Sequence, residues 1–297
     1  MPTSDTKCNI CPRGCSIDRT KNKGYCGVSC GISSVAAAKA MLHYGEEPVI
    51  SGKNGSGAVF FSGCNMGCVF CQNYCISSGA KGKEITVERL SRIFLELRDR
   101  GADNINLVTA THFVPQVAKA LKSVKAWLNI PVIFNCGGYE KVESLKMLEG
   151  LIDVYLPDIK YCSDDLAIRY SNAPNYFETA YAALCEMLRQ TGKYQIENGL
   201  IKKGVIVRHL ILPGCYKDSM EIFRRLAPFK ENILISLMRQ YCPMGKAADY
   251  SEINRKLTTF EYNKVLDLCM EIGYEGFTQE KSSATDEMTP DFDFSGL

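Results

Sequence analysis

The densest group of reactive residue types is the segment GCNMGCVFCQNYC (63–75). Its cysteines Cys64, Cys68 and Cys71 are spaced C-x3-C-x2-C, which lets one short loop place three thiolates around a single iron–sulfur cluster. A four-iron cluster that has only three protein ligands keeps one iron open to an external ligand. The spacing therefore predicts a 4Fe–4S centre of catalytic type, with these three thiolates as its ligands.

Cys75 leaves a second interpretation of this segment open. It would complete a C-x3-C-x2-C-x3-C set, and four thiolates suit a closed structural zinc site. Two further features favour the cluster. Gly63 and Gly67 allow the close backbone approach that a bulky inorganic core requires, and the apolar run AVFFS (58–62) places the motif directly after a buried strand.

A second cysteine group lies near the N-terminus, in CNICPRGC and GYCG. Cys8, Cys11, Cys15 and Cys26 are spaced C-x2-C-x3-C-x10-C, and Cys30 follows closely. Four thiolates make a complete ligand set for a structural zinc or for an auxiliary 4Fe–4S cluster, and the choice between them stays open. Such a site would relay electrons, anchor a substrate, or fold a segment too short to build its own core.

Cysteine content sets this chain apart, because 15 of its 297 residues are cysteine and nine of these precede position 76. The N-terminus lacks the apolar run of a secretory signal, so we expect a cytoplasmic location and no disulfide framework. The net charge of +2 gives no strong signal for nucleic-acid binding, and no apolar run is long enough to span a membrane. Thiolate ligation of metal is the chemistry that the composition favours.

Alternating apolar and amphipathic stretches predict the elements that position these cysteines. Six apolar runs are expected as strands, at residues 58–62, 104–110, 131–135, 152–157, 203–212 and 232–238. The stretches between and after them are expected as helices, at residues 87–100, 114–128, 141–150, about 163–191, 219–229 and 254–273. This order is typical of a parallel sheet covered by helices. Six units predict an α/β fold of the partial (β/α)6 barrel type rather than a closed eight-fold barrel.

Three regions are expected along the chain. Residues 1–50 stand outside the strand–helix alternation and form a small cysteine-rich, metal-binding cap, residues 51–280 form the barrel, and residues 281–297 form a polar, acidic surface tail. Functional loops of such barrels lie at the carboxyl ends of the strands. The central cysteine motif directly follows one of these ends.

C-x3-C-x2-C with an aromatic residue before the last cysteine, here Phe70, resembles the radical S-adenosylmethionine (SAM) superfamily. The resemblance implies that the open iron binds the amino and carboxylate groups of SAM, and that Phe70 lies near the adenine. One electron, from a reductant such as flavodoxin or ferredoxin, would then split SAM into methionine and a 5′-deoxyadenosyl radical. That radical would take a hydrogen atom from a substrate.

The likeness extends beyond the cysteine motif. NCGGY (135–139), LPDIK (156–160) and VRHLILPG (207–214) are similar, in order and spacing, to segments of the pyruvate formate-lyase activating enzymes. The chain thus resembles an activating-enzyme-like branch of the superfamily, which implies a radical SAM oxidoreductase that acts on a protein or peptide.

Three charged residues of these segments are site candidates. The resemblance implies that Asp158, Lys160 and Arg208 help to hold SAM and substrate. Asp158 and Lys160 are two positions apart on a strand and share a face, where a buried ion pair is costly unless it serves a polar ligand. Arg208 and His209 are adjacent and must face opposite ways, and the resemblance favours Arg208 as the residue inside the barrel.

Two departures from the family pattern bear on the substrate more than on the chemistry. The family's Gly-Gly-Glu, which closes the second strand and binds the amino group of SAM, is replaced by VTATHFVP (108–115). Thr109, Thr111 and His112 occupy that strand end, and each can accept a hydrogen bond from an amine. The activating enzymes also lack a clear counterpart of the N-terminal cysteine group.

Other functional classes are compatible with parts of the sequence. A radical SAM enzyme that modifies a small molecule would carry the same motifs. A non-enzymatic iron–sulfur or zinc redox protein would explain the cysteines, but not six strand–helix units or the charged residues at their ends. Substrate loops have no transferable signature, so the sequence does not specify the substrate.

Overall fold

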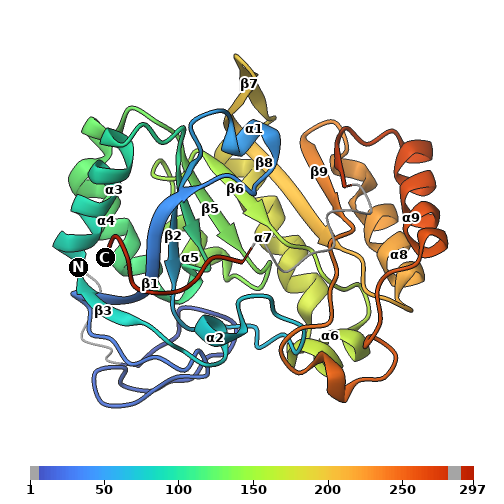
Figure 1. Cartoon of the computed structure of the whole chain (residues 1–297), viewed down its shortest axis with the longest axis horizontal. Coiled ribbons are helices and arrows are strands. Elements are labelled where there is room, and N and C mark those ends of the chain that lie inside the picture. The colour runs from blue at the N-terminus through green and yellow to red at the C-terminus, as the bar shows by residue number, and fades with distance from the viewer. Residues whose placement is uncertain (1–6, 280–288) are drawn as a thin grey trace.

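The computed structural model describes residues 7–279 and 289–297, and its centre is one large sheet (Figure 1). The strand order is β10-β9-β8-β6-β5-β4-β2-β1-β3, with β7 (Gln195–Glu197) paired to β8 outside this path. Strands β3 (Lys83–Thr86) and β10 (Gly276–Thr278) lie at opposite ends of that order and do not pair with each other. The sheet is therefore curved but open, as the partial barrel requires.

Six parallel strands build the barrel, and all six were predicted from the apolar runs. They are β2 (Ser56–Phe61), β4 (Ile105–Val108), β5 (Val132–Cys136), β6 (Val154–Pro157), β8 (Leu200–Leu210) and β9 (Ile233–Met238). Each neighbouring pair is parallel, and the short β10 adds a seventh parallel strand beside β9. The α/β fold and the partial barrel are confirmed.

Helices cover the outer face of this sheet (Figure 1). They are α3 (Val87–Asp99), α4 (Val114–Leu128), α5 (Val142–Lys146), α6 (Asp164–Ser171), α7 (Tyr176–Thr191), α8 (Tyr216–Leu226) and α9 (Thr259–Ile272). The single helical region expected at about 163–191 is two helices, because Asn172 ends α6 in the left-handed conformation and Pro174 follows it.

A strand that the sequence did not predict, β1 (Ser34–His43), pairs antiparallel with both β2 and β3. Its sequence, SVAAAKAMLH, is rich in alanine, which has low strand propensity, so local pattern gave little sign of it. The sheet thus already includes residues before position 50, where we expected the N-terminal region to end. The division into three regions stays a prediction.

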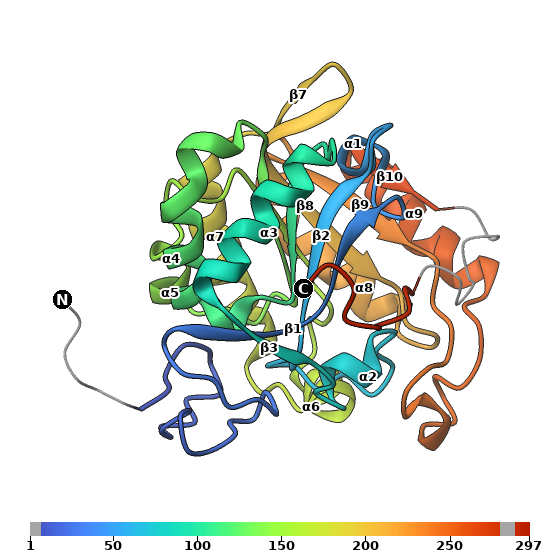
Figure 2. The same ribbon diagram turned by 60° about the vertical axis from the view of Figure 1, so that its left-hand side comes forward.

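Residues 7–33, the described chain before β1, are built almost entirely from turns and lie at the lower left in Figure 2. Residues 8–33 contain no helix or extended strand among those that the structure describes. A bridge joins Lys7 to Asp18, and the amide of Cys8 donates to the carbonyl of Ile17 at 2.7 Å. A segment with so little regular structure depends on other contacts for its order.

At the other end of the chain, residues 281–288 of the expected tail lie outside the described residues, while residues 289–297 pack along β1 (Figure 1). The amide of Phe294 donates to the carbonyl of Ala38 at 3.1 Å, and the amide of Ala40 donates to the carbonyl of Ser295 at 3.0 Å. Phe292 is buried with its ring centroid 5.5 Å from that of Phe60. This segment therefore contributes to the core.

The barrel interior is apolar at one end and polar at the other. Ile50 of α1 (Pro48–Ser51) packs against strand residues that include Ile133, Leu156 and Ile206, and this cluster fills the amino-terminal end of the barrel. The carboxyl ends of the strands point the other way, toward α2 (Tyr74–Ser77) and α6 (Figure 1). The fold thus leaves the carboxyl end available for a site.

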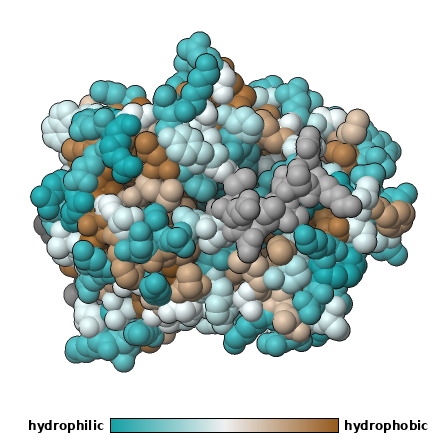
Figure 3. Space-filling view, viewed as in Figure 1, coloured by the Kyte–Doolittle hydropathy of each residue, from teal (hydrophilic) through white to brown (hydrophobic). Residues whose placement is uncertain are grey.

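The molecular surface mixes polar and apolar residues, as Figure 3 shows for one face. Large exposed apolar side chains occur on several elements, among them Trp127 of α4 and Met270 of α9. None of the helices in the described part of the chain has both the length and the apolar content needed to cross a bilayer.

We predict that Phe292→Ala lowers the free energy of unfolding by about 3 kcal/mol, because it removes a buried aromatic ring from the contact with Phe60. Anaerobic denaturant unfolding measures this change. Phe260→Ala is the matched control, since Phe260 is 60% exposed. Equal stability of the two variants would contradict the packing of the C-terminal segment.

Candidate active site

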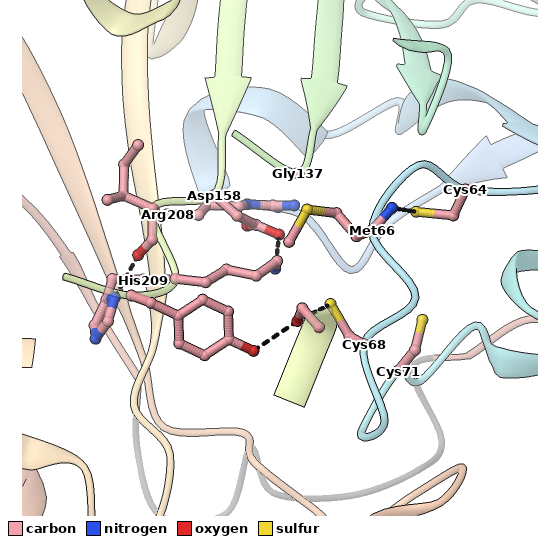
Figure 4. Close-up of polar contacts among 12 residues, drawn as sticks. Cys64, Met66, Cys68, Cys71, Gly137, Asp158, Arg208 and His209 are labelled. Atoms are coloured by element: carbon pink, nitrogen blue, oxygen red, sulfur yellow. Dashed lines mark hydrogen bonds and ion pairs between the residues drawn. The ribbon is translucent and has the colours of Figure 1, made fainter. Parts of the chain in front are cut away.

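A cavity of about 410 Å³ opens at the carboxyl ends of the barrel strands. Cys64, Cys68 and Cys71 line it from the loop after β2. The ends of β4, β5, β6, β8 and β9 contribute much of the remaining wall, together with residues 43–48, residues 277–279, Thr289 and Pro290. In Figure 4 the three cysteines lie on one side of the site, and Asp158 and Arg208 lie on the other. The structure therefore brings the central motif and the predicted charged residues into one cavity.

Each thiol of the central motif accepts a hydrogen bond from the surrounding chain. The amide of Met66 donates to Sγ of Cys64 at 3.3 Å, Ser171 Oγ donates to Sγ of Cys68 at 2.9 Å, and Ser77 Oγ donates to Sγ of Cys71 at 3.3 Å. Hydrogen bonds to ligand sulfurs stabilise thiolates and tune the potential of an iron–sulfur cluster.

The electrostatics of the three thiols fit a metal cluster. Burial, together with the charge of Cys68, raises the pKa of Cys64 to about 12, and burial with the charge of Cys68 raises the pKa of Cys71 to about 11. Three such thiols cannot all ionise side by side unless cationic charge sits between them. The sulfur-directed donors show that the site is nevertheless built for thiolates, so the donor set fits a 4Fe–4S cluster.

Asp158 and Lys160 form a partly buried ion pair just after β6, and both side chains line the cavity. Burial lowers the pKa of Lys160, but the charges of Asp158 and Cys68 outweigh that effect and raise it above its usual value. The ammonium in turn lowers the pKa of Cys68 and so opposes the effect of burial on that thiol. Both residues follow β6, which ends at Pro157, rather than lying on the strand as predicted, and their side chains still meet in the cavity, where Lys160 places positive charge beside the cysteine loop.

Arg208 lines the same cavity, where two carboxylates of the loop before α1 hold its guanidinium. It donates to Glu47 at 2.9 and 2.7 Å and also pairs with Glu46. Asn106 on β4 donates to Glu46 at 2.8 Å, which fixes that carboxylate. The sequence did not predict these glutamates as site residues. The only sequence signal was a pair of adjacent acids, GEEP, before an apolar turn.

His209 faces the opposite side of β8, as the alternation of side chains requires. Its Nδ1 lies 2.6 Å from the carbonyl of Ile159, and its ring packs edge-on against Phe223 of α8. Burial lowers the pKa of His209 to about 4, so the ring is neutral near pH 7. In Figure 4 it points away from the three cysteines.

Three residues after β4 were predicted to contact SAM, namely Thr109, Thr111 and His112. Of these, only Thr109 lines the cavity. Its φ angle is 62°, a left-handed conformation that is rare and strained for a β-branched residue. The amide of Thr109 donates to the carbonyl of Asn135 at 2.8 Å, which helps to hold this backbone. Strain of this kind concentrates at functional sites.

Thr111 and His112 lie behind the cavity wall. Thr111 Oγ1 donates to Glu140 at 2.9 Å, and His112 Nε2 lies 2.8 Å from the carbonyl of Ser62. Burial lowers the pKa of His112 to about 3, and its carbonyl accepts a hydrogen bond from Arg19. The structure therefore places Thr109 where a bound molecule can reach it and places Thr111 and His112 where they support the loop.

Phe70 and Cys75 occupy different surroundings although both belong to the central motif. Phe70 is buried, lines the cavity and packs against Tyr241 with ring centroids 6.0 Å apart. Cys75 lies on α2, is exposed and does not line the cavity. The zinc interpretation needs Cys75 beside the other three thiols, and the structure turns it outward instead.

The N-terminal cysteines also come together. An added Cβ at Gly24 would lie 3.6 Å from Sγ of both Cys15 and Cys26, and the charges of Cys8, Cys26 and Cys15 contribute to the raised pKa of Cys11. Burial is the larger cause of that rise, to about 11. Within residues 7–279 and 289–297, no three Cys, His, Asp or Glu side chains lie close enough to hold a single metal ion.

Much of the barrel matches a known protein family. Residues 58–227, more than half of the chain, match the profile of the radical SAM superfamily. The chain belongs to this superfamily, whose members are enzymes that use a 4Fe–4S cluster and SAM.

The chain is similar to two proteins in sequence and to one solved structure in fold. An uncharacterized protein of Methanocaldococcus jannaschii is 33% identical over 273 residues, 88% of this chain and 73% of its own length. The pyruvate formate-lyase-activating enzyme of Clostridium pasteurianum is 27% identical over 184 residues, 59% of this chain and 69% of that protein. Streptococcus suis SuiB, bound to its precursor peptide SuiA, aligns with a TM-score of 0.52 at 13% identity over 78% of this chain. The chain spans about half of the SuiB chain, 51%, and this likeness shows the fold.

We predict that Thr109→Gly raises the free energy of unfolding by about 1 kcal/mol, because glycine adopts the left-handed conformation without strain. Thr109→Ala keeps the Cβ and should recover little of this energy. Denaturant unfolding of both variants measures the difference. A glycine variant no more stable than the alanine variant would show that Thr109 is not strained.

The raised pKa of the buried Glu140 carboxyl predicts that the free energy of unfolding depends on pH. Burial raises its pKa from 4.5 to about 7, so the folded protein binds more protons than the unfolded chain between these values. Stability therefore falls as the pH rises from 4.5 to about 7 and levels off above it. Glu140→Gln removes this fall, which amounts to up to about 3 kcal/mol.

Unfolding experiments at several pH values on the wild type and Glu140→Gln measure this difference. Glu143→Gln on α5 is the control, because Glu143 is exposed and should leave the slope unchanged. Parallel pH profiles for the wild type and Glu140→Gln would rule out a raised pKa at this position.

Proposed function

We propose that this protein cleaves SAM reductively and uses the resulting radical to abstract hydrogen from a protein or peptide substrate. The observation that carries the proposal is one cavity lined by the three motif cysteines, Phe70, Thr109 and the charged strand ends. When bound, the 4Fe–4S cluster supplies the electron that cleaves SAM. A family profile over more than half of the chain supports the same reaction.

The chain's own residues bind and orient SAM in this proposal. Cys64, Cys68 and Cys71 hold the cluster at the cavity wall. Thr109 offers its hydroxyl to the amino group of SAM, in the place where the family carries a glutamate. Phe70 provides an apolar surface for the adenine, and it is buried enough to keep water from that side.

The charged pairs shape the other half of the cavity. Lys160 offsets negative charge at the cysteine loop, because its ammonium opposes the rise that burial causes in the pKa of Cys68. Arg208 is held by Glu46 and Glu47, so its guanidinium is fixed in the cavity wall rather than free to swing. Such fixed polar groups orient a bound molecule without reorganising during the reaction.

Two comparisons support a protein or peptide as the substrate. One relative is named as an activating enzyme for pyruvate formate-lyase, and the fold resembles SuiB, which was solved with a precursor peptide. A small-molecule substrate is the alternative within the same reaction class.

Cys8, Cys11, Cys15 and Cys26 would hold a second metal, either a 4Fe–4S cluster or zinc. We also propose that a reductant such as flavodoxin or ferredoxin supplies the electron and that the reaction takes place in the cytoplasm, where reducing conditions suit a cysteine-rich chain.

Anaerobically reconstituted protein, incubated with dithionite and SAM, should release methionine and 5′-deoxyadenosine, which chromatography with mass spectrometry detects. Cys71→Ala should abolish this product, whereas Cys75→Ala, a change at an exposed cysteine, should leave it unchanged. Equal product from the wild type and Cys71→Ala would sink the proposal.

Metal content tests the second site separately. Iron and acid-labile sulfide should fall by one cluster in Cys64→Ala. If the N-terminal group also holds a cluster, they should fall by one cluster in Cys8→Ala, whereas zinc loss from Cys8→Ala would identify that metal instead. A Cys8→Ala protein with the full metal content of the wild type would remove the N-terminal group as a metal site.

A further inference from the structure

Arg13, which lies between two cysteines of the N-terminal group, reaches into the central cysteine loop. Its Nε donates to the carbonyl of Asn65 at 2.7 Å, and its Nη2 donates to the carbonyl of Met66 at 2.7 Å. Both acceptors lie between Cys64 and Cys68 in the sequence. One guanidinium therefore fixes the backbone of the loop that carries the first two cluster ligands.

The same guanidinium also holds the end of α6. Nη2 donates to the carbonyl of Ser171 at 3.2 Å, and Nη1 donates to that of Asn172. Ser171 is the residue whose hydroxyl donates to Sγ of Cys68. Arg13 thus contacts both the loop that carries Cys68 and the end of α6 that donates a hydrogen bond to it. The planar guanidinium can donate to four carbonyls at once, which a lysine ammonium cannot do in the same geometry.

Tyr25 and Cys26 add a second set of contacts from the N-terminal group. The Tyr25 ring stacks 3.7 Å beneath the Arg13 guanidinium, and its hydroxyl donates to the carbonyl of Met66 at 3.1 Å. The amide of Cys64 donates to the carbonyl of Cys26 at 3.3 Å. A cysteine of one group is therefore joined to a cysteine of the other by a single backbone hydrogen bond.

Gly63 and Gly67, the two glycines of the central loop, leave room for the N-terminal group. Both have positive φ, 84° at Gly63 and 83° at Gly67. An added Cβ at Gly63 would lie 2.4 Å from the carbonyl oxygen of Cys26, and one at Gly67 would lie 2.8 Å from the Tyr25 hydroxyl. The sequence suggested close approach to the cluster as their purpose. The structure shows that both glycines also approach the N-terminal group closely.

We propose that Arg13 is a positioning residue for the central cluster, and that metal loading of the N-terminal four-thiol group sets the geometry of the central cysteine loop through it. This inference rests on the proposed function for the identity of the two metal sites. Residues 8–33 have no helix or extended strand in the described chain, so their order depends on the metal that their thiolates bind. Loading that site orders the turn that carries Arg13, and Arg13 then holds the loop of Cys64 and Cys68.

Reconstituted full-length protein tests the proposal with the SAM-sensitive EPR signal of the reduced cluster, its midpoint potential and its iron content. We expect Arg13→Gln and Arg13→Lys both to shift this signal and potential. The rate of SAM cleavage should fall by about a hundredfold, the effect of a misplacement of roughly 1 Å. Cys11→Ala should reproduce the shift, because it unloads the N-terminal site.

Arg92→Gln is the matched control, since Arg92 is exposed on α3 and should leave signal and potential unchanged. A wild-type signal and potential in Arg13→Gln would overturn the proposal. So would a shift in Cys11→Ala that Arg13→Lys does not share, because the coupling would then bypass Arg13. Loss of the proposed function is distinguishable, since wild-type protein that shows the SAM-sensitive signal without 5′-deoxyadenosine would refute cleavage and leave this coupling standing.

Discussion

The hydrogen bonds that fix the backbone of the central cysteine loop are the constraint on which the rest of the site depends. The side chain of Asn65 donates to the carbonyl of Tyr139 at 2.6 Å, the amide of Val69 donates to the carbonyl of Tyr170 at 2.9 Å, and Arg13 holds the loop from the N-terminal side. Each partner comes from a different segment of the chain. A loop of this length has no regular structure to order it, so its three thiols keep their positions only because these segments are packed around it.

The barrel interior has an apolar half and a polar half, and the cavity lies in the polar half. Apolar side chains around Ile50 close the amino-terminal end and exclude water from it. Charged side chains gather at the carboxyl end, where Lys160 pairs with Asp158 and Arg208 pairs with Glu46 and Glu47. Buried ion pairs add little net stability because desolvation costs about as much as the attraction returns. Their value here is that they present fixed polar groups to a charged cofactor.

The first and last segments that the structure describes both meet the barrel near β1 and the end of β2. The N-terminal turns contact the cysteine loop, and the C-terminal segment pairs with β1 while Thr289 and Pro290 line the cavity. Segments outside the six strand–helix units therefore complete the site. The segment that carries the N-terminal cysteines contacts the central cysteine loop directly, through Arg13 and Cys26.

The sequence by itself determined the six barrel strands and the central motif. Each of these follows from periodicity or spacing within a few residues, which local backbone geometry enforces. Only the tertiary structure decided that Arg208 pairs with Glu46 and Glu47, more than 160 residues earlier, that Thr109 takes a left-handed conformation, and that β1 joins the sheet. It also decided that Thr111 and His112 lie behind the cavity wall, and that Gly63 and Gly67 make room for the N-terminal group. Contacts of this kind join segments far apart in the chain, and no local pattern encodes which of them pack together.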